Sequence, residues 1–275
     1  MLRARIIMLF LAAALIVLLF NLPRVVVDNA GGSIPPGDSA QSVDSEASQN
    51  FLHNQEVSPG DAEIISALKA SIQKEENQEK TPIFADSLAE LYLFYRKFDS
   101  AATYFERAAK LDPGEERWIK AGNAYYEAFT YAVDADIADY FGQKIREIFN
   151  PIIEEDPSRL DLKTKVGMTW VSSSNPMQGI TMLREVLEEN PENEEALYNL
   201  GILAFQTGQY QTAIERFVSL TRVNESNTQG HFYLGLCYKE TGDFEMAKKQ
   251  FKIVKEMDKS PEVQATVDSY LEEMN

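Results

Sequence analysis

Hydrophobic residues are distributed in three different ways along this chain. Residues 6–20 form an unbroken apolar run, IIMLFLAAALIVLLF, with Arg3 and Arg5 just before it. Residues 28–60 are rich in Ser, Gly, Asp, Asn and Pro. From residue 61 onward, apolar residues recur at three- and four-residue spacing, which is typical of amphipathic helices. The pattern predicts an all-α domain that follows an apolar segment and a polar linker.

The apolar run has the features of a membrane anchor. Its fifteen residues span about 22 Å as a helix, and apolar neighbours on both sides extend it toward the ~30 Å hydrocarbon core. Residues 25–68 contain acids but no Lys or Arg, so the charge asymmetry predicts an N-terminus inside and the rest outside. We predict an uncleaved single-pass anchor over residues 1–27. A cleaved signal peptide is the main alternative, although Pro23 and Arg24 make a poor cleavage site, and a buried helix is the third.

The segment after the anchor is expected to be a flexible acidic linker over residues 28–60. It contains too few apolar residues to offset the entropy of ordering. Its root-mean-square reach would be about 30 Å, which would hold the domain near the membrane. Residues 61–79 are predicted to form one more helix, a candidate cap for the N-terminal end of the domain.

A repeat organises the rest of the chain. The stretches ALYNLGILAFQTGQYQTAIERF and HFYLGLCYKETGDFEMAKKQF align with an offset of 34 residues. The aligned positions share residue type, and they are Leu200/Leu234, Gly201/Gly235, Gly208/Gly242, Tyr210/Phe244, Ala213/Ala247 and Phe217/Phe251. Small residues allow two helices to approach closely, and Gly208 and Gly242 suit a left-handed helix end. Each helix hairpin leaves an apolar face uncovered, so such units must stack.

This pattern resembles the tetratricopeptide-repeat (TPR) family, with its W-x2-L-G-x2-Y start followed by Ala, Phe, Ala and Pro. The resemblance implies an α-solenoid over residues 80–275. We expect about five hairpins and a C-terminal capping helix, at residues 82–115, 116–159, 160–193, 194–227, 228–261 and 262–274. The second copy is about ten residues too long around residues 130–140, and longer helices or a small loop would accommodate the surplus.

Charge and composition exclude several kinds of function. The net charge of −17 disfavours nucleic acid as a partner. The chain has one cysteine, Cys237, and two histidines, His53 and His231, which stand far apart in sequence. Cys237 and His231 are expected to be packing residues, and no catalytic, cofactor or metal motif is present. We therefore predict a non-enzymatic protein without cofactor or metal.

The TPR resemblance implies that the first helix of each hairpin lines a concave groove. It places an apolar strip there in the last three hairpins, made of Met168, Tyr198, Ile202, Phe205, Phe232 and Leu236. It places further groove positions in the first two hairpins at Asp86, Glu90, Leu93, Phe94, Asn123, Tyr126 and Glu127. The strip is expected to bind an amphipathic helix or an apolar peptide. Alternatively, several of its residues pack against the next helix, or the groove holds a segment of the same chain or a second copy.

The layout predicts a protein-binding scaffold or adaptor tethered to a cell membrane by its N-terminal helix. It looks like bacterial envelope TPR proteins, which would place the anchor in the inner membrane and the TPR domain in the periplasm. It is also similar in layout to TPR factors of cytochrome c maturation and cell-division coordination. A homo-oligomeric spacer of the envelope is the other alternative.

Overall fold

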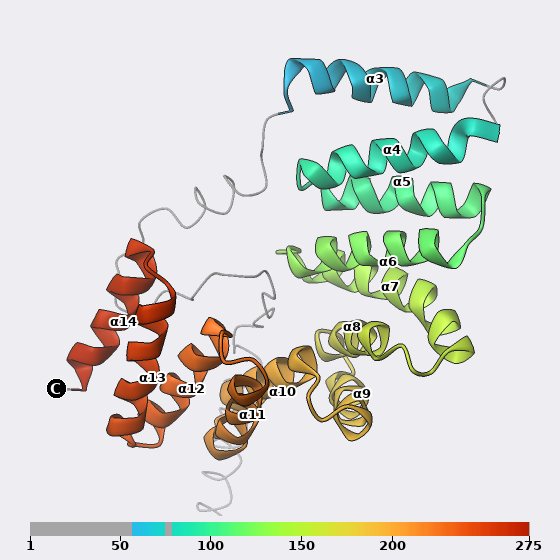
Figure 1. Ribbon diagram of the computed structural model, residues 1–275. Helices are drawn as coiled ribbons and strands as arrows, with labels where there is room; N and C mark the ends of the chain where they lie inside the picture. Colours follow the sequence, from blue (N-terminus) through green and yellow to red (C-terminus); the bar gives the residue numbers. More distant parts are fainter. Residues whose placement is uncertain (1–56, 75–78, 275) are drawn as a thin grey trace, which may run out of the picture.

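The computed structural model describes residues 57–74 and 79–274, and the predicted anchor and nearly all of the predicted linker lie outside them. The described part consists of helices without strands. None of its helices is both long enough and apolar enough to cross a membrane. The helices keep their labels from Figure 1, and the first of them, α3, spans Pro59–Gln73.

Ten of the helices form five successive hairpins. Their first helices (A) are α4 (Thr81–Phe94), α6 (Glu115–Thr130), α8 (Leu160–Val171), α10 (Glu194–Gln206) and α12 (Thr228–Glu240). Their second helices (B) are α5 (Phe98–Leu111), α7 (Ala135–Glu155), α9 (Pro176–Glu189), α11 (Tyr210–Val223) and α13 (Phe244–Met257). Helix α14 (Pro261–Glu273) packs on α13, and α3 packs on α4, so these two helices close the ends of the array.

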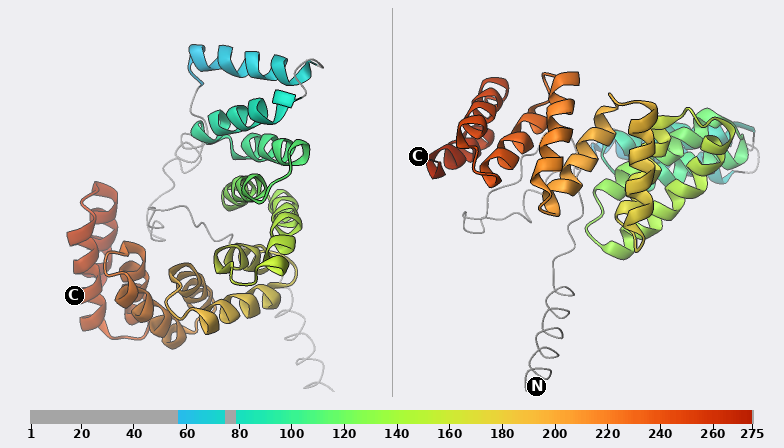
Figure 2. Two further views of the ribbon diagram at one scale, coloured as in Figure 1. Left: turned by 45° about the vertical axis from the view of Figure 1, so that its right-hand side comes forward. Right: turned by 90° about the horizontal axis from the view of Figure 1, so that it is seen from below.

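The hairpins follow one another along a curved path rather than around a closed bundle (Figures 1 and 2). Helix α10 contacts both α8 and α12, whereas no two B helices pack closely on one another. In a curved stack the layer with the closer neighbours follows the shorter, inner arc. The A helices therefore form the concave face and the B helices the convex face, as the TPR resemblance implies.

Small residues on the A helices set the distance between the two helices of a hairpin. A Cβ atom on Gly201 would lie 2.8 Å from the ring of Phe217, and one on Gly235 would lie 2.9 Å from the ring of Phe251. Both rings are fully buried. The 34-residue spacing of these glycines and phenylalanines in the sequence therefore reports one contact, repeated in successive hairpins.

The second hairpin takes up its surplus residues in a longer B helix. Helix α7 has 21 residues, whereas α5, α9, α11 and α13 have 14 each. Asp134 caps its start by accepting hydrogen bonds from the amides of Asp136 and Ile137. The helix continues through Pro151 to Glu155. The longer-helix alternative is the one that the structure adopts.

Candidate functional site

A pocket on the concave face lies between the first two hairpins. Helices α4 and α6 do not pack on each other as α8, α10 and α12 do, and both instead pack on α5. The pocket, of about 770 Å³, separates them. Its lining comes from α4, α5, α6 and the turns that follow α4 and α6. It consists of Glu90, Leu93, Phe94, Arg96, Phe98, Phe105, Lys120, Asn123, Ala124, Glu127 and Tyr131. We call this the α4–α6 pocket.

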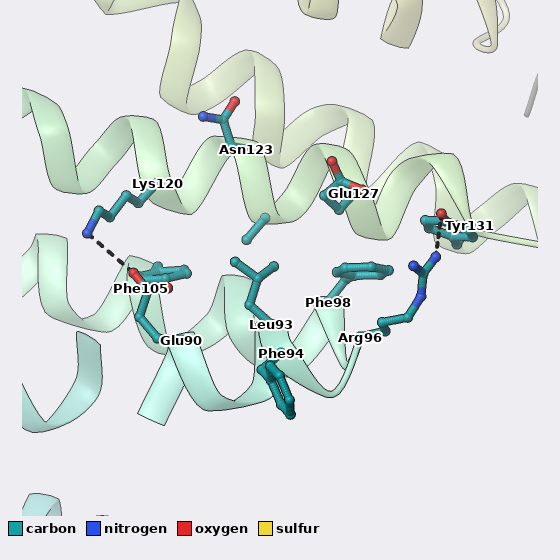
Figure 3. A pocket seen from close by; sticks show the side chains of 11 residues that line it. Glu90, Leu93, Phe94, Arg96, Phe98, Phe105, Lys120, Asn123, Glu127 and Tyr131 are labelled. Carbon is teal, nitrogen blue, oxygen red and sulfur yellow. Dashed lines mark hydrogen bonds and ion pairs between the residues drawn. The ribbon is translucent and has the colours of Figure 1, made fainter. Parts of the chain in front are cut away.

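The floor of the α4–α6 pocket is apolar. Phe98 and Phe105 of α5 are buried beneath it, and Leu93 of α4 is half-buried beside them (Figure 3). Phe94 lies at the rim with 70 % of its surface exposed. Its ring meets that of Tyr95 edge-on, and Tyr95 in turn donates a hydrogen bond to Asp61 of α3, at 2.5 Å. The contact with α3 therefore holds the end of α4 that carries Phe94.

Charged side chains stand at the two ends of the pocket. At one end, Lys120 Nζ lies 3.3 Å from Glu90 Oε1. At the other end, the guanidinium of Arg96 lies 5.4 Å from the ring centre of Phe98 and 5.1 Å from that of Tyr131. Arg96 also donates a hydrogen bond from Nη2 to the Tyr131 hydroxyl at 2.5 Å (Figure 3). Aromatic contacts of this kind hold a cation in a fixed place.

A polar network connects α6 of the pocket to the next two A helices. Lys165 of α8 donates a hydrogen bond to Asn123 Oδ1 at 2.6 Å and lies 5.5 Å from the ring centre of Tyr126. The hydroxyl of Tyr126 lies 3.4 Å from Glu195 of α10. Burial raises the pKa of Glu195 above its ordinary value, while Lys165 and Tyr126 act in the opposite direction. The network joins three A helices at the middle of the concave face.

The structure separates the predicted apolar strip into two groups. Four of its residues are buried, namely Met168, Ile202, Phe232 and Leu236. The ring of Phe232 packs against Phe251 and against Tyr270 of α14, so the capping helix covers it. Burial leaves these four side chains almost no surface for a partner, as the packing alternative supposes.

Tyr198 and Phe205 retain part of their surface. Their rings lie 6.0 and 5.8 Å from that of Tyr233, which stands between them. Their role in binding a partner stays a prediction. The pocket residues Glu90, Leu93, Phe94, Asn123 and Glu127 all occupy groove positions that the repeat pattern identifies. Arg96 and Tyr131 lie in the turns after α4 and α6, where that pattern assigns no groove position.

Cys237 and His231 are both buried packing residues. The ring nitrogens of His231 lie 2.7 Å from Gln250 Oε1 and 3.1 Å from the carbonyl oxygen of Glu225. Within residues 57–74 and 79–274, no three or more His, Cys, Asp or Glu side chains are grouped so as to hold a metal ion.

Stacked helix hairpins with an open concave face define the class of α-solenoid interaction proteins. Residues 172–231 and residues 229–257 each match a tetratricopeptide-repeat family model. Residues 172–257 therefore carry tetratricopeptide repeats, as the 34-residue pattern predicts. No curated protein matches the sequence significantly.

Solved structures of other TPR proteins are similar to this one at low identity. The crystal structure of MamA is 20 % identical, with a TM-score of 0.46, and the match covers 62 % of this chain and 94 % of that chain. MamA 41-end from Desulfovibrio magneticus RS-1 is 18 % identical, with a TM-score of 0.49 and coverages of 66 % and 96 %. YrrB, a TPR protein with an unusual peptide-binding site, is 18 % identical, with a TM-score of 0.44 and coverages of 74 % and 98 %. At these scores the likeness says nothing about a partner or a site.

Proposed function

We propose that this protein is a scaffold whose concave face binds a segment of a partner protein. The observation that carries the proposal is the α4–α6 pocket, which combines an apolar floor with the exposed ring of Phe94. A pocket of this size with apolar walls and a few charged groups is a typical binding site. An aromatic side chain exposed at 70 % gains hydrophobic free energy when a partner covers it.

The proposal also includes a tether. The apolar run of residues 6–20, with Arg3 and Arg5 before it, supports an N-terminal anchor in a bacterial inner membrane with the TPR domain in the periplasm. A linker of about thirty residues would keep the domain close to the membrane and raise its effective concentration for a membrane-bound partner. In a fractionation experiment, the full chain should remain with membranes after carbonate washing, and recovery in the soluble fraction would overturn the tether.

Site-specific photo-crosslinking in the native cell tests the binding face. A photoreactive phenylalanine analogue replaces Phe94 in one variant and Val218 in the control. Val218 is 41 % exposed on the B helix α11, so it samples the convex face. We expect a discrete adduct with another protein from position 94 and none from position 218.

Three outcomes of that experiment distinguish the scaffold from the alternatives. An adduct from position 94 with a different protein supports the scaffold. An adduct with a second copy of this chain favours the homo-oligomeric spacer. Equal adducts from both positions, or none from position 94, would overturn the assignment of binding to the concave face. The same analogue at Phe205 asks whether the site extends to the last hairpins.

A further inference from the structure

The four charged side chains that line the α4–α6 pocket, Glu90, Arg96, Lys120 and Glu127, sum to zero charge but differ in the partners they have. Lys120 and Glu90 face each other at 3.3 Å. The guanidinium of Arg96 is held between Phe98 and Tyr131. Glu127 is exposed at the opening, and it forms no ion pair with any described residue. One carboxylate therefore remains available above the apolar floor.

Arg96 maintains this arrangement at a cost to folding. Its φ of 55° is in the left-handed region, where Gly208 and Gly242 stand in later hairpins. A residue with a Cβ pays about 1–2 kcal/mol to adopt that conformation. Its Nε atom is also buried without a hydrogen-bond partner, which costs free energy as well. Strain of this kind persists where the surrounding structure imposes it, and it concentrates at binding sites.

Two consequences of the Arg96 placement bear on what can bind. The side chain closes one end of the pocket and fixes the aromatic wall made by Phe98 and Tyr131. Its charge is directed into that wall and forms no ion pair with Glu127. An incoming cation therefore meets an unpaired carboxylate at the opening. The two cations of the lining already have partners, Lys120 in Glu90 and Arg96 in Tyr131 and Phe98.

We propose that the α4–α6 pocket recognises an extended peptide segment of a partner protein that carries a Lys or Arg next to a large apolar side chain. The apolar side chain lies on Leu93, Phe98 and Phe105, and the cation pairs with Glu127. The net charge of −17 favours a basic segment further, because it attracts cationic partners at long range. This inference rests on the proposed function and adds the chemistry of the partner.

A random peptide library displayed on phage provides the probe. The full chain is immobilised in mild detergent, and peptides are selected on the wild type, on Glu127→Lys and on Glu215→Lys. Glu215 lies exposed on the B helix α11, so it gives the same charge change on the convex face. We expect the wild type and Glu215→Lys to enrich Lys or Arg beside Leu or Phe, and Glu127→Lys to enrich Asp or Glu instead.

Affinity measurements with one enriched peptide show how much each substitution weakens binding. Glu127→Gln should weaken binding about threefold and Glu127→Lys about tenfold or more, because a partly exposed ion pair is lost or reversed. Glu215→Lys should leave the affinity unchanged. Leu93→Glu, which places a charge on the floor, should abolish binding, and circular dichroism should show the same helical content for all variants.

Several results would overturn the inference. They are enrichment without a cationic residue, equal affinity of the wild type and Glu127→Lys, and binding that survives Leu93→Glu. Binding that appears only after residues 28–56 are deleted would assign the pocket to the chain's own linker. Self-association that Glu127→Lys abolishes in light scattering would assign it to a second copy. If position 94 still crosslinks to a partner in Glu127→Lys, the scaffold function stands and the inference about charge fails.

Discussion

Arg96 occupies in the first hairpin the same left-handed position that Gly208 occupies in the fourth. Their φ angles are 55° and 71°. The amide of Arg96 donates to Leu93 O at 2.9 Å, and that of Gly208 donates to Phe205 O at 3.0 Å. Both turns thus end helix A in the same way. The difference is that Arg96 adds a side chain which reaches Phe98 and Tyr131 at the end of the α4–α6 pocket.

Replacing Arg96 separates backbone strain from side-chain contacts. Arg96→Ala removes the aromatic contacts but keeps the strain of a Cβ at positive φ, so its free energy of unfolding should fall by about 1–2 kcal/mol. Arg96→Gly removes the same contacts and relieves the strain, so it should be about 1 kcal/mol more stable than Arg96→Ala. Urea denaturation followed by circular dichroism measures both.

The fourth hairpin provides the matched control. Gly208→Ala places a Cβ at a φ of 71° and so introduces the strain that Arg96→Gly removes. It should lower the free energy of unfolding by about 1 kcal/mol. A Cβ on Gly208 meets nothing within 4 Å, so packing does not contribute to this change. Equal stabilities of Arg96→Gly and Arg96→Ala would show that the backbone at residue 96 is not strained.

Gly179 marks the closest approach of two helices in the third hairpin. A Cβ there would lie 2.3 Å from the carbonyl oxygen of Gly167 and 2.6 Å from the amide nitrogen of Val171. Both atoms belong to the backbone, so α8 and α9 would have to move apart. We expect Gly179→Ala to lower the free energy of unfolding by about 1–3 kcal/mol or more. Thermal unfolding checks the value.

The same substitution at Gly60 is the control for Gly179. Gly60 lies in the first turn of α3, and a Cβ there meets nothing within 4 Å. Because alanine is the better helix former, Gly60→Ala should leave stability unchanged or raise it by up to about 1 kcal/mol. A loss at Gly60 as large as that at Gly179 would mean that the close approach of α8 and α9 is not the cause.

The sequence predicts the fold because the repeat encodes local contacts. Gly201 and Phe217 lie 16 residues apart in one hairpin and touch, and the pair Gly235 and Phe251 repeats the contact 34 residues later. Each contact depends on residue size within a single hairpin, so a periodic pattern suffices to reveal it. The sequence leaves the length of α7 open between two alternatives, a longer helix and a small loop. The number of surplus residues alone does not decide between them.

The candidate site was harder to predict because exposure depends on contacts between hairpins. The TPR resemblance places both Phe232 and Phe94 at groove positions. Phe232 is covered by Tyr270 of α14, whereas Phe94 is 70 % exposed. Arg96 was missed for a different reason, since its residue type breaks the repeat pattern and only its backbone angle reveals that it keeps the glycine geometry.

Cys237 should report the opening of the last hairpin. Its side chain is fully buried, and burial raises the pKa of the thiol to about 12. An unfolded cysteine has a pKa of about 8.5, so at pH 8 the thiolate fraction of native Cys237 is far lower than that of the unfolded chain. We expect alkylation of Cys237 by iodoacetamide at pH 8 to be very slow in native buffer and to accelerate with urea.

The control places a cysteine at the exposed position of Gln211 in a Cys237→Ser background. Gln211→Cys should react at once. Rapid labelling of native Cys237 would contradict its burial.

Glu195 should make the protein less stable as the pH rises, whereas an ion-paired carboxylate makes a protein more stable. Its folded pKa is raised above the ordinary value of 4.5, chiefly by burial, and the charges of Lys165 and the hydroxyl of Tyr126 do not offset this. Between pH 4.5 and the folded pKa, Glu195 therefore carries a proton in the folded state that it has lost in the unfolded state. In that interval the contribution of Glu195 to stability declines as the pH rises through the folded pKa, and it is fully present below 4.5.

Glu195→Gln isolates this contribution because glutamine resembles the protonated acid in shape and charge. The variant should be more stable than the wild type at pH 7, and the difference should vanish as the pH falls below 4.5. Glu192→Gln, three residues earlier and exposed, should stay within about 0.5 kcal/mol of the wild type at pH 7. Urea titrations of the three proteins between pH 4 and pH 8 measure the effect. A variant that is less stable than the wild type at pH 7 would show that the pairing of Glu195 with Lys165 and Tyr126 outweighs its burial, so that the network across α6, α8 and α10 stabilises the charged carboxylate.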